Sequence, residues 1–210
     1  MSDNSSEKKY YIHTPKQHRS LMRYHHILHT AANMFARVGY DNVGTNHIAD
    51  EAGISVGSFY QFFSGKEALV DALTAYYITE LQTVLPRDIQ KNTPIALVVR
   101  TMLENVFEFA RQQVAFAYIL SPANTGHLSQ VAIQLHLTLE GWVEGLLTVY
   151  HPALSADKIH LCAAAGMGIV KGMMMMAQPP DDVPFDVVIT EMVEALMAYV
   201  DNFVLRHQPR

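Results

Sequence analysis

Cysteine, charge and long apolar runs are all scarce in this chain of 210 residues. The single cysteine, Cys162, cannot form an internal disulfide, which excludes a disulfide-stapled fold and favours a reducing, cytoplasmic setting. The first twenty residues are polar and lack an apolar core, so we expect no secretory signal. The longest apolar stretch, 161–177, contains Lys171 and is shorter than the roughly 20 residues of a bilayer span. We interpret it as a buried helix and expect no membrane role.

The charges are unevenly distributed along the chain. The formal net charge is −5, yet residues 1–66 carry seven Lys and Arg against five Asp and Glu, and residues 67–210 carry eight against fifteen. A basic N-terminal part can approach phosphate groups, whereas an acidic body repels them. This asymmetry is typical of a two-part regulator that binds nucleic acid with one end.

Strand patterns are absent from the sequence. No segment alternates apolar and polar residues, and no hairpin dipeptide separates two apolar runs. Apolar residues instead recur at helical spacing, so the sequence predicts an all-α fold of about nine helices. Thr45 and Ser55 are predicted N-caps, and Gly39 and Gly53 predicted helix stops. The expected helices cover 20–38, 46–52, 56–62, 66–84, 94–112, 113–120, 127–150, 156–177 and 185–206.

Three regions follow from this pattern. Residues 1–19 are predicted to form a flexible polar arm, residues 20–66 a helix-turn-helix domain, and residues 67–210 a ligand-binding and dimerisation domain. The basic residues of the arm are candidates for contacts with a DNA backbone, and a plain disordered tail is the alternative. They are Lys8, Lys9, Lys16 and Arg19.

The segment 45–66 is the most informative for function. On a helical wheel for residues 56–62, extended to the next residue, Phe59, Phe62 and Phe63 share one face, which we expect to point inward. Gly57, Tyr60 and Gln61 fall on the opposite face, with Val56 and Ser58 at its flanks. A second short helix with a polar outer face is typical of a helix that enters the major groove.

The outer face carries groups suited to DNA. Gln61 can pair with an adenine edge, Ser58 can bond to a base or phosphate, and Val56 can pack on a thymine methyl group. The hydroxyl of Tyr60 is a candidate phosphate contact. Thr45 and Lys66, at the starts of their helices, are further candidates, and Ser55 completes the set. The alternative is that all of these residues are caps and solvated positions on a small bundle.

A longer pattern surrounds this segment, and it consists of Ile27-Leu28, Ala31-Ala32, Phe35, Gly39-Tyr40, Thr45, Ile48-Ala49, the run from Ala52 to Phe63, and Lys66 to Leu69. Over roughly 21–80, without a gap, this pattern resembles the DNA-binding domain of the tetracycline-repressor (TetR) family. The resemblance implies a three-helix DNA-binding domain, a connecting helix, and a bundle that dimerises through its last two helices.

The resemblance also implies roles for single residues. Contacts to the DNA backbone fall on Thr45, Tyr60 and Lys66. Base-reading positions fall on Val56, Gly57, Ser58 and Gln61. The family often has a basic residue where this chain has Val56, so one charged contact to DNA is missing. The resemblance favours a repressor that binds an inverted-repeat operator in double-stranded DNA.

The last two expected helices have the composition of a dimer seam. Residues 185–206 are apolar on two sides, and Gly168 and Gly172 permit close backbone contact. We expect a homodimer in which each chain contributes 156–177 and 185–206. An internal core of a monomer is the alternative.

An adaptable apolar pocket is predicted in the same region, for a small apolar or amphipathic effector. Polar candidates at its wall are the pairs His136 with Glu140 and Glu104 with Glu108, each four residues apart on one helix face. Plain core packing is the alternative for the apolar members. The candidate ligand residues are Met102, Asn105, Phe109, Phe116, His136, Trp142 and Met173.

Other chemistry finds little support. His25, His26 and His29 suggest a metal site, but no nearby Cys or Asp completes it, and we expect neither a metal nor a cofactor. No Gly-x-Ser-x-Gly or His-Glu-x-x-His motif is present, so we expect no enzyme. The alternative to a regulator is a dimeric small-molecule-binding module without specific DNA readout.

Overall fold

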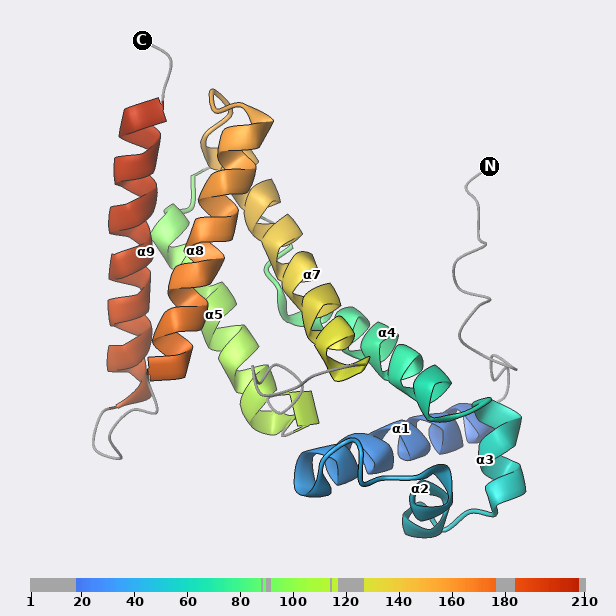
Figure 1. Cartoon of the computed structure of the whole chain (residues 1–210). Helices are drawn as coiled ribbons and strands as arrows, with labels where there is room; N and C mark the ends of the chain where they lie inside the picture. The colour runs from blue at the N-terminus through green and yellow to red at the C-terminus, as the bar shows by residue number, and fades with distance from the viewer. Residues whose placement is uncertain are drawn as a thin grey trace, which may run out of the picture. The chain divides into compact units, whose positions relative to one another are not determined.

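The computed structural model describes residues 18–87, 89, 92–113, 115–116, 127–176 and 184–207 (Figure 1). These residues form eight α-helices and no strand, which confirms the predicted all-α fold. Most of the expected helix 113–120 lies outside the described residues. The helices are α1 (His18–Val38), α2 (Thr45–Glu51), α3 (Val56–Phe62), α4 (Lys66–Val84), α5 (Ile95–Gln112), α7 (His127–Tyr150), α8 (Ala156–Met176) and α9 (Phe185–His207).

The chain divides into two compact units. The first contains Met1–Thr83 and Ala110–Leu135, and the second contains Val84–Phe109 and His136–Arg210. The first unit therefore includes nearly all of α4 in addition to α1, α2 and α3. The functional boundary at residue 66 stays a prediction.

The first unit is built around the apolar stripe of α1. Leu28, Ala31 and Phe35 recur three and four residues apart and are fully buried. Two glycines with positive φ redirect the chain after α1 and α2, Gly39 at 86° and Gly53 at 63°, because other residues rarely adopt this backbone conformation. Both were predicted as helix stops.

One predicted cap is wrong by a residue. Thr45 is the first helical residue of α2, and Gly44 is its N-cap, with extended backbone angles. The backbone N–H of Gly44 donates to Nδ1 of His47 at 3.5 Å. The side chain of Thr45 is therefore available for another partner.

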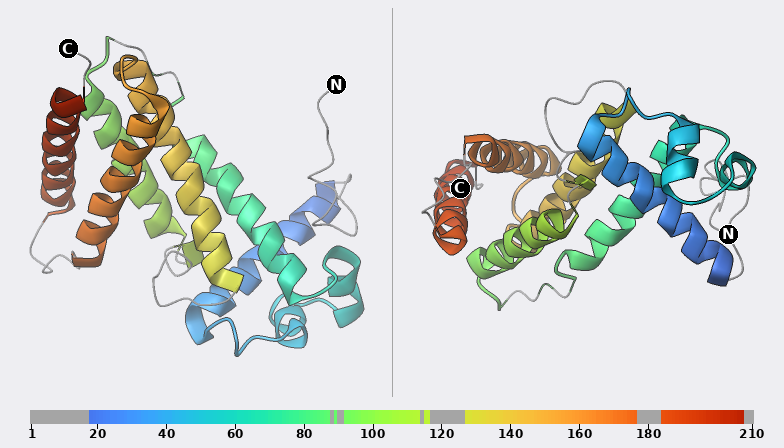
Figure 2. Two further views of the ribbon diagram at one scale, coloured as in Figure 1. Left: turned by 45° about the horizontal axis from the view of Figure 1, so that its top comes forward. Right: turned by 90° about the horizontal axis from the view of Figure 1, so that it is seen from below.

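The second unit is a helical bundle, and side chains of α7, α8 and α9 contribute to its core. Figure 2 shows α8 and α9 side by side, and their contact buries Cys162, Ala163 and Val200. Two aromatic side chains of α7 form hydrogen bonds with the segment before α5. Nε1 of Trp142 donates to the carbonyl oxygen of Pro86 at 3.0 Å. The hydroxyl of Tyr150 donates to the backbone carbonyl oxygen of Thr93 at 2.6 Å.

None of the helices in the described residues is long and apolar enough to cross a bilayer. The stretch 161–177, interpreted as a buried helix, is only partly buried in the single chain: Cys162 and Ala163 are buried, whereas Leu161 is 53% exposed. Its cysteine, Cys162, is 1% exposed, and burial raises the pKa of its thiol.

Candidate nucleic-acid interface

Helix α3 presents a polar face to solvent, as predicted. Phe59 and Phe63 are fully buried, and Phe62 is 7% exposed. The ring of Phe63 stacks on Tyr24 of α1 with 5.2 Å between ring centroids, which fixes the rotation of α3 about its axis. As a result Gly57, Tyr60 and Gln61 are exposed. This face is the candidate DNA surface of the chain.

The start of α3 is held by the predicted cap. The backbone N–H of Ser58 donates to Oγ of Ser55 at 3.1 Å, and the two hydroxyl oxygens lie 2.9 Å apart. The cap satisfies a backbone donor that the helix itself leaves unpaired. The hydrogen bond between the two hydroxyls uses one of their two protons, so the pair keeps one proton and unused lone pairs for a base or phosphate. Val56, directly after Ser55, is half-buried.

Two of the predicted phosphate contacts come together at the surface. Oγ1 of Thr45, at the start of α2, lies 3.3 Å from the hydroxyl oxygen of Tyr60 in α3. Tyr60 is 45% exposed, and its ring packs edge-on against Phe59. The hydrogen bond therefore holds the phenol at the seam of α2 and α3, where one proton remains for an acceptor such as a phosphate oxygen.

The third predicted phosphate contact is anchored within the chain. Nζ of Lys66 donates to the carbonyl oxygen of Tyr40 at 2.9 Å and lies 3.9 Å from the centroid of the Tyr40 ring. Burial, followed by the nearby charge of Glu67, raises the pKa of Tyr40. Lys66 thus fixes the loop between α1 and α2 and keeps two ammonium protons for another acceptor.

Three of the histidines of α1 have structural partners. Nε2 of His26 lies 3.2 Å from the carbonyl oxygen of Ala52, at the end of α2. His25 and His29 both pack edge-on against the ring of Tyr76. Burial, followed by the charge of His25, lowers the pKa of His29. These contacts brace α1 against α2 and α4.

The predicted ligand residues do not form one site. Met102 and Trp142 line an apolar cavity of about 40 Å³ in the second unit, together with residues of α5, α7, α8 and α9. Asn105 instead donates to the carbonyl oxygen of Val84 at 2.7 Å, and Phe116 packs against Tyr77 in the first unit. Phe109 is buried, Met173 is half-buried, and His136 lies 4.0 Å from Glu140; none of the three lines this cavity.

Sequence reasoning missed a second hollow. A groove of about 450 Å³ lies in the first unit between α4 and the start of α7. Its walls are Val70, Asp71, Thr74, Ala75, Ile78, Gln130, Val131 and Gln134. Small-molecule sites usually measure about 300–1,000 Å³, so the groove has the volume of a ligand site and the apolar cavity does not. No spacing rule links residue 75 to residue 131, and only the tertiary packing brings them together.

Comparison with known proteins extends this picture. The family described as "Bacterial regulatory proteins, tetR family" matches residues 27–73. The uncharacterized HTH-type transcriptional regulator YuxN of Bacillus subtilis is 27% identical over 144 residues, which are 65% of this chain and 48% of YuxN. The chain therefore spans about half the length of this curated relative.

Solved structures share the fold over most of the chain. A tetR-family transcriptional regulator from Streptomyces coelicolor superposes with a TM-score of 0.67 at 16% identity, covering 90% of each chain. AibR, solved in complex with isovaleryl coenzyme A and operator DNA, gives a TM-score of 0.62 at 17% identity, covering 82% of this chain and 97% of AibR. At these identities the likeness concerns the fold.

Proposed function

Because the chain belongs to the tetR family of bacterial regulatory proteins, we propose that it is a sequence-specific DNA-binding transcription regulator, acting in the cytoplasm as a repressor that a small molecule releases. The observation that carries the proposal is the exposed face of α3. Phe59 and Phe62 of α3 and Phe63 directly after it face inward, whereas Tyr60 and Gln61 face solvent, and Ser55 caps the start of the helix. This arrangement supports insertion of α3 into a major groove.

Each candidate residue takes a role from its position. Gln61 is proposed to pair with an adenine edge, and Val56 and Gly57 to pack against base edges at the start of α3. Ser58, with its cap Ser55, contacts a base or phosphate. Thr45, Tyr60 and Lys66 are proposed to bind phosphate oxygens on either side of the groove.

The direct test is a fluorescence-anisotropy titration with DNA from the promoter of the chain's own gene and with a scrambled fragment of equal length. We expect tight binding to the promoter alone, and at least about a tenfold loss for Gln61→Ala, since a bidentate base contact is worth about 1–3 kcal/mol. Equal affinity for both fragments would refute sequence-specific regulation and favour the binding module without DNA readout.

A homodimer is proposed to form through α8 and α9. In the single chain Leu161 of α8 and Leu205 of α9 are 53% and 77% exposed, and Gly168 has open space around its backbone. Exposed apolar side chains, and a glycine with open space around it, favour close packing of a second copy. A two-fold dimer would present two copies of α3 to half-sites about 34–36 Å apart, or a multiple of that distance, in an inverted repeat.

The effector is proposed to be small and apolar or amphipathic. The apolar cavity lined by Met102 and Trp142 is too small at about 40 Å³ for more than a few atoms, so such a ligand must push its walls apart. AibR was solved in complex with isovaleryl coenzyme A and operator DNA, and this supports the proposal that the shared fold can bind both a ligand and an operator.

Helix α4 begins at Lys66 and ends at Val84, whose carbonyl oxygen accepts a hydrogen bond from Asn105 of α5. A shift of α5 is thus proposed to move α4 and weaken DNA binding, with a coupling of about 1–3 kcal/mol.

Two filling variants distinguish the possible effector sites. Val143→Phe narrows the apolar cavity, and Ala75→Trp places a large side chain in the groove beside α4. After a screen of apolar compounds for release from the operator, we expect Val143→Phe to abolish the response and Ala75→Trp to keep it. The reverse result would place the effector in the groove. A screen in which no compound alters operator affinity would refute the ligand switch.

A further inference from the structure

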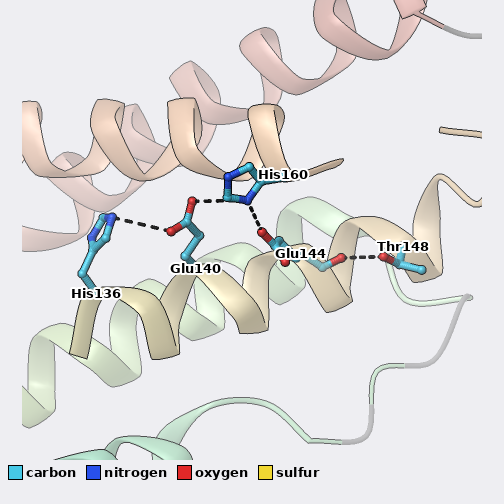
Figure 3. Close-up of polar contacts among 5 residues, drawn as sticks. All are labelled: His136, Glu140, Glu144, Thr148 and His160. Atoms are coloured by element: carbon cyan, nitrogen blue, oxygen red, sulfur yellow. Dashed lines mark hydrogen bonds and ion pairs between the residues drawn. The ribbon is translucent and has the colours of Figure 1, made fainter. Parts of the chain in front are cut away.

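Two imidazoles and two carboxylates meet where α7 and α8 pack together in the second unit (Figure 3). His136, Glu140 and Glu144 follow one another at four-residue intervals, so they lie on one face of α7. His160 reaches across from α8. Its Nδ1 lies 2.6 Å from Oε1 of Glu144 and 4.0 Å from Oε1 of Glu140.

Glu140 is the unusual member of this cluster. It is the only charged residue that is buried among those the structure describes, and its side chain is 10% exposed. No hydrogen bond to its carboxylate is found within the described part of the chain. Its charged neighbours are two imidazole nitrogens at 4.0 Å, Nε2 of His136 and Nδ1 of His160. Burial of a carboxylate without hydrogen bonds is costly, and a bound cation would remove that cost.

We propose that Glu140, Glu144 and His160 bind a divalent transition metal ion of the zinc type. Their three ligand atoms all lie within 4.8 Å of one another. Ligand atoms around tetrahedral Zn²⁺ lie about 3.4 Å apart, given metal–ligand distances of about 2.0–2.2 Å. To bind the ion, the distance from Nδ1 of His160 to Oε1 of Glu144 must increase and its distance to Oε1 of Glu140 must decrease, each by less than about 1 Å. The side chain of His160 is 67% exposed and that of Glu144 35%, so both have room to move.

The ligand types decide the class of metal. One imidazole and two carboxylates leave a fourth position for water, as in open zinc sites. Mg²⁺ and Ca²⁺ prefer oxygen ligands alone and larger coordination numbers. His136 acts as a positioning residue, because its Nε2 faces Oε2 of Glu140, the oxygen that does not face His160.

Such a metal would join two walls of the apolar cavity. Trp142 and Val143 of α7, which follow Glu140, line that cavity, as does Cys162 of α8, which follows His160. The ion would hold α7 against α8 from outside the cavity. The proposal concerns only this helix pair and does not rest on the DNA-binding function.

The test uses the full chain, stripped of metal with a chelator and titrated with Zn²⁺ against a fluorescent zinc indicator. We expect one high-affinity Zn²⁺ per chain. His160→Ala and Glu144→Gln should each weaken it at least about 100-fold, and His136→Ala about 10–100-fold with unchanged stoichiometry. Co²⁺ should give the intense visible absorption of a tetrahedral site in the wild type and in His136→Ala, but not in His160→Ala. Mg²⁺ and Ca²⁺ should not compete with Zn²⁺.

Matched controls separate this site from other histidines. Thr148→Ala changes the next turn of the same α7 face, where the hydroxyl donates to the backbone oxygen of Glu144, and should leave Zn²⁺ affinity unchanged. His25→Gln removes a histidine from the cluster on α1 and should also have no effect. The proposal is overturned if Zn²⁺ affinity survives in a folded His160→Ala variant, or if His25→Gln is the variant that abolishes it. Thermal melting without metal establishes that each variant folds.

Discussion

Lys66 contacts Tyr40 within the chain and is proposed to bind a DNA phosphate, and a single substitution can distinguish these two roles. Within the chain its ammonium group bonds to the Tyr40 carbonyl and covers the Tyr40 ring. On DNA it is proposed to reach a phosphate as well. Lys66→Met keeps most of the side-chain volume and removes the charge. The phosphate contact predicts a weaker salt dependence of DNA binding, whereas the contacts within the chain predict a lower free energy of unfolding.

The loss in DNA binding follows from counterion release. Each phosphate contact in duplex DNA contributes about −0.9 to the slope of log affinity against log salt concentration. A dimer has two copies of Lys66, so Lys66→Met should flatten the slope by about 1.8. Doubling the salt from about 0.1 to 0.2 M then weakens the wild type about 3.5-fold more than the variant. Lys66→Arg keeps the charge and should keep the slope.

The loss in stability follows from the contacts within the chain. A hydrogen bond from a charged donor and a cation–π contact, both half-exposed, together contribute about 1–2 kcal/mol to the free energy of unfolding. The measurements are anisotropy titrations at several salt concentrations and urea unfolding. If Lys66→Met lowers the free energy of unfolding but leaves the salt slope of the wild type unchanged, Lys66 only anchors the loop and is not a phosphate contact.

Three further predictions concern the core, a histidine and the dimer. Phe63→Ala should lower the free energy of unfolding by about 3–5 kcal/mol in urea, because the ring is fully buried and stacked on Tyr24; a loss below about 1 kcal/mol would contradict this packing. The folded-state pKa of His29 lies below its ordinary value of 6.5, mainly because the ring is buried, so the unfolded chain binds a proton more tightly. The free energy of unfolding should therefore fall as pH drops below about 6.5, and His29→Gln should reduce that fall; an identical pH profile for the variant would refute the assignment. Leu205→Glu should convert the proposed α8–α9 dimer to a monomer in sedimentation experiments, and a stable dimer in that variant would contradict the proposed interface.

The helix-turn-helix could be predicted residue by residue because its signals are local. Three phenylalanines within five positions define the inner face of α3, and Ser55 caps it, so neither inference needs a distant residue. The boundaries of α3 and α4 are those predicted from the sequence. The cap of α2 was misplaced because Gly44 and Thr45 are both suited to an N-cap, and the pattern does not choose between adjacent candidates.

The pocket and the α7–α8 cluster could be predicted only in part, because helical spacing identifies a buried face without its partner. Met102 and Trp142 line one cavity, but Phe116, equally apolar, packs on Tyr77 in the other unit. Glu140 was noticed beside His136 through the four-residue spacing. His160 was missed because it reaches Glu144 from another helix, and no local pattern records that approach.

The composition of α3 also constrains how this protein can select its operator. The helix Val56–Phe62 contains no charged residue, and Arg37, an exposed cation of α1, is paired with Glu51 of α2 at 3.1 Å. Sequence-independent attraction to DNA grows with the number of phosphates that cations neutralise. Lys66 is the proposed cation at this face, and Arg19 of α1 is a further candidate for a backbone contact. Salt weakens phosphate contacts, which operator and random DNA share, whereas hydrogen bonds and methyl contacts to bases are little affected. Discrimination between operator and random DNA should therefore persist as salt rises.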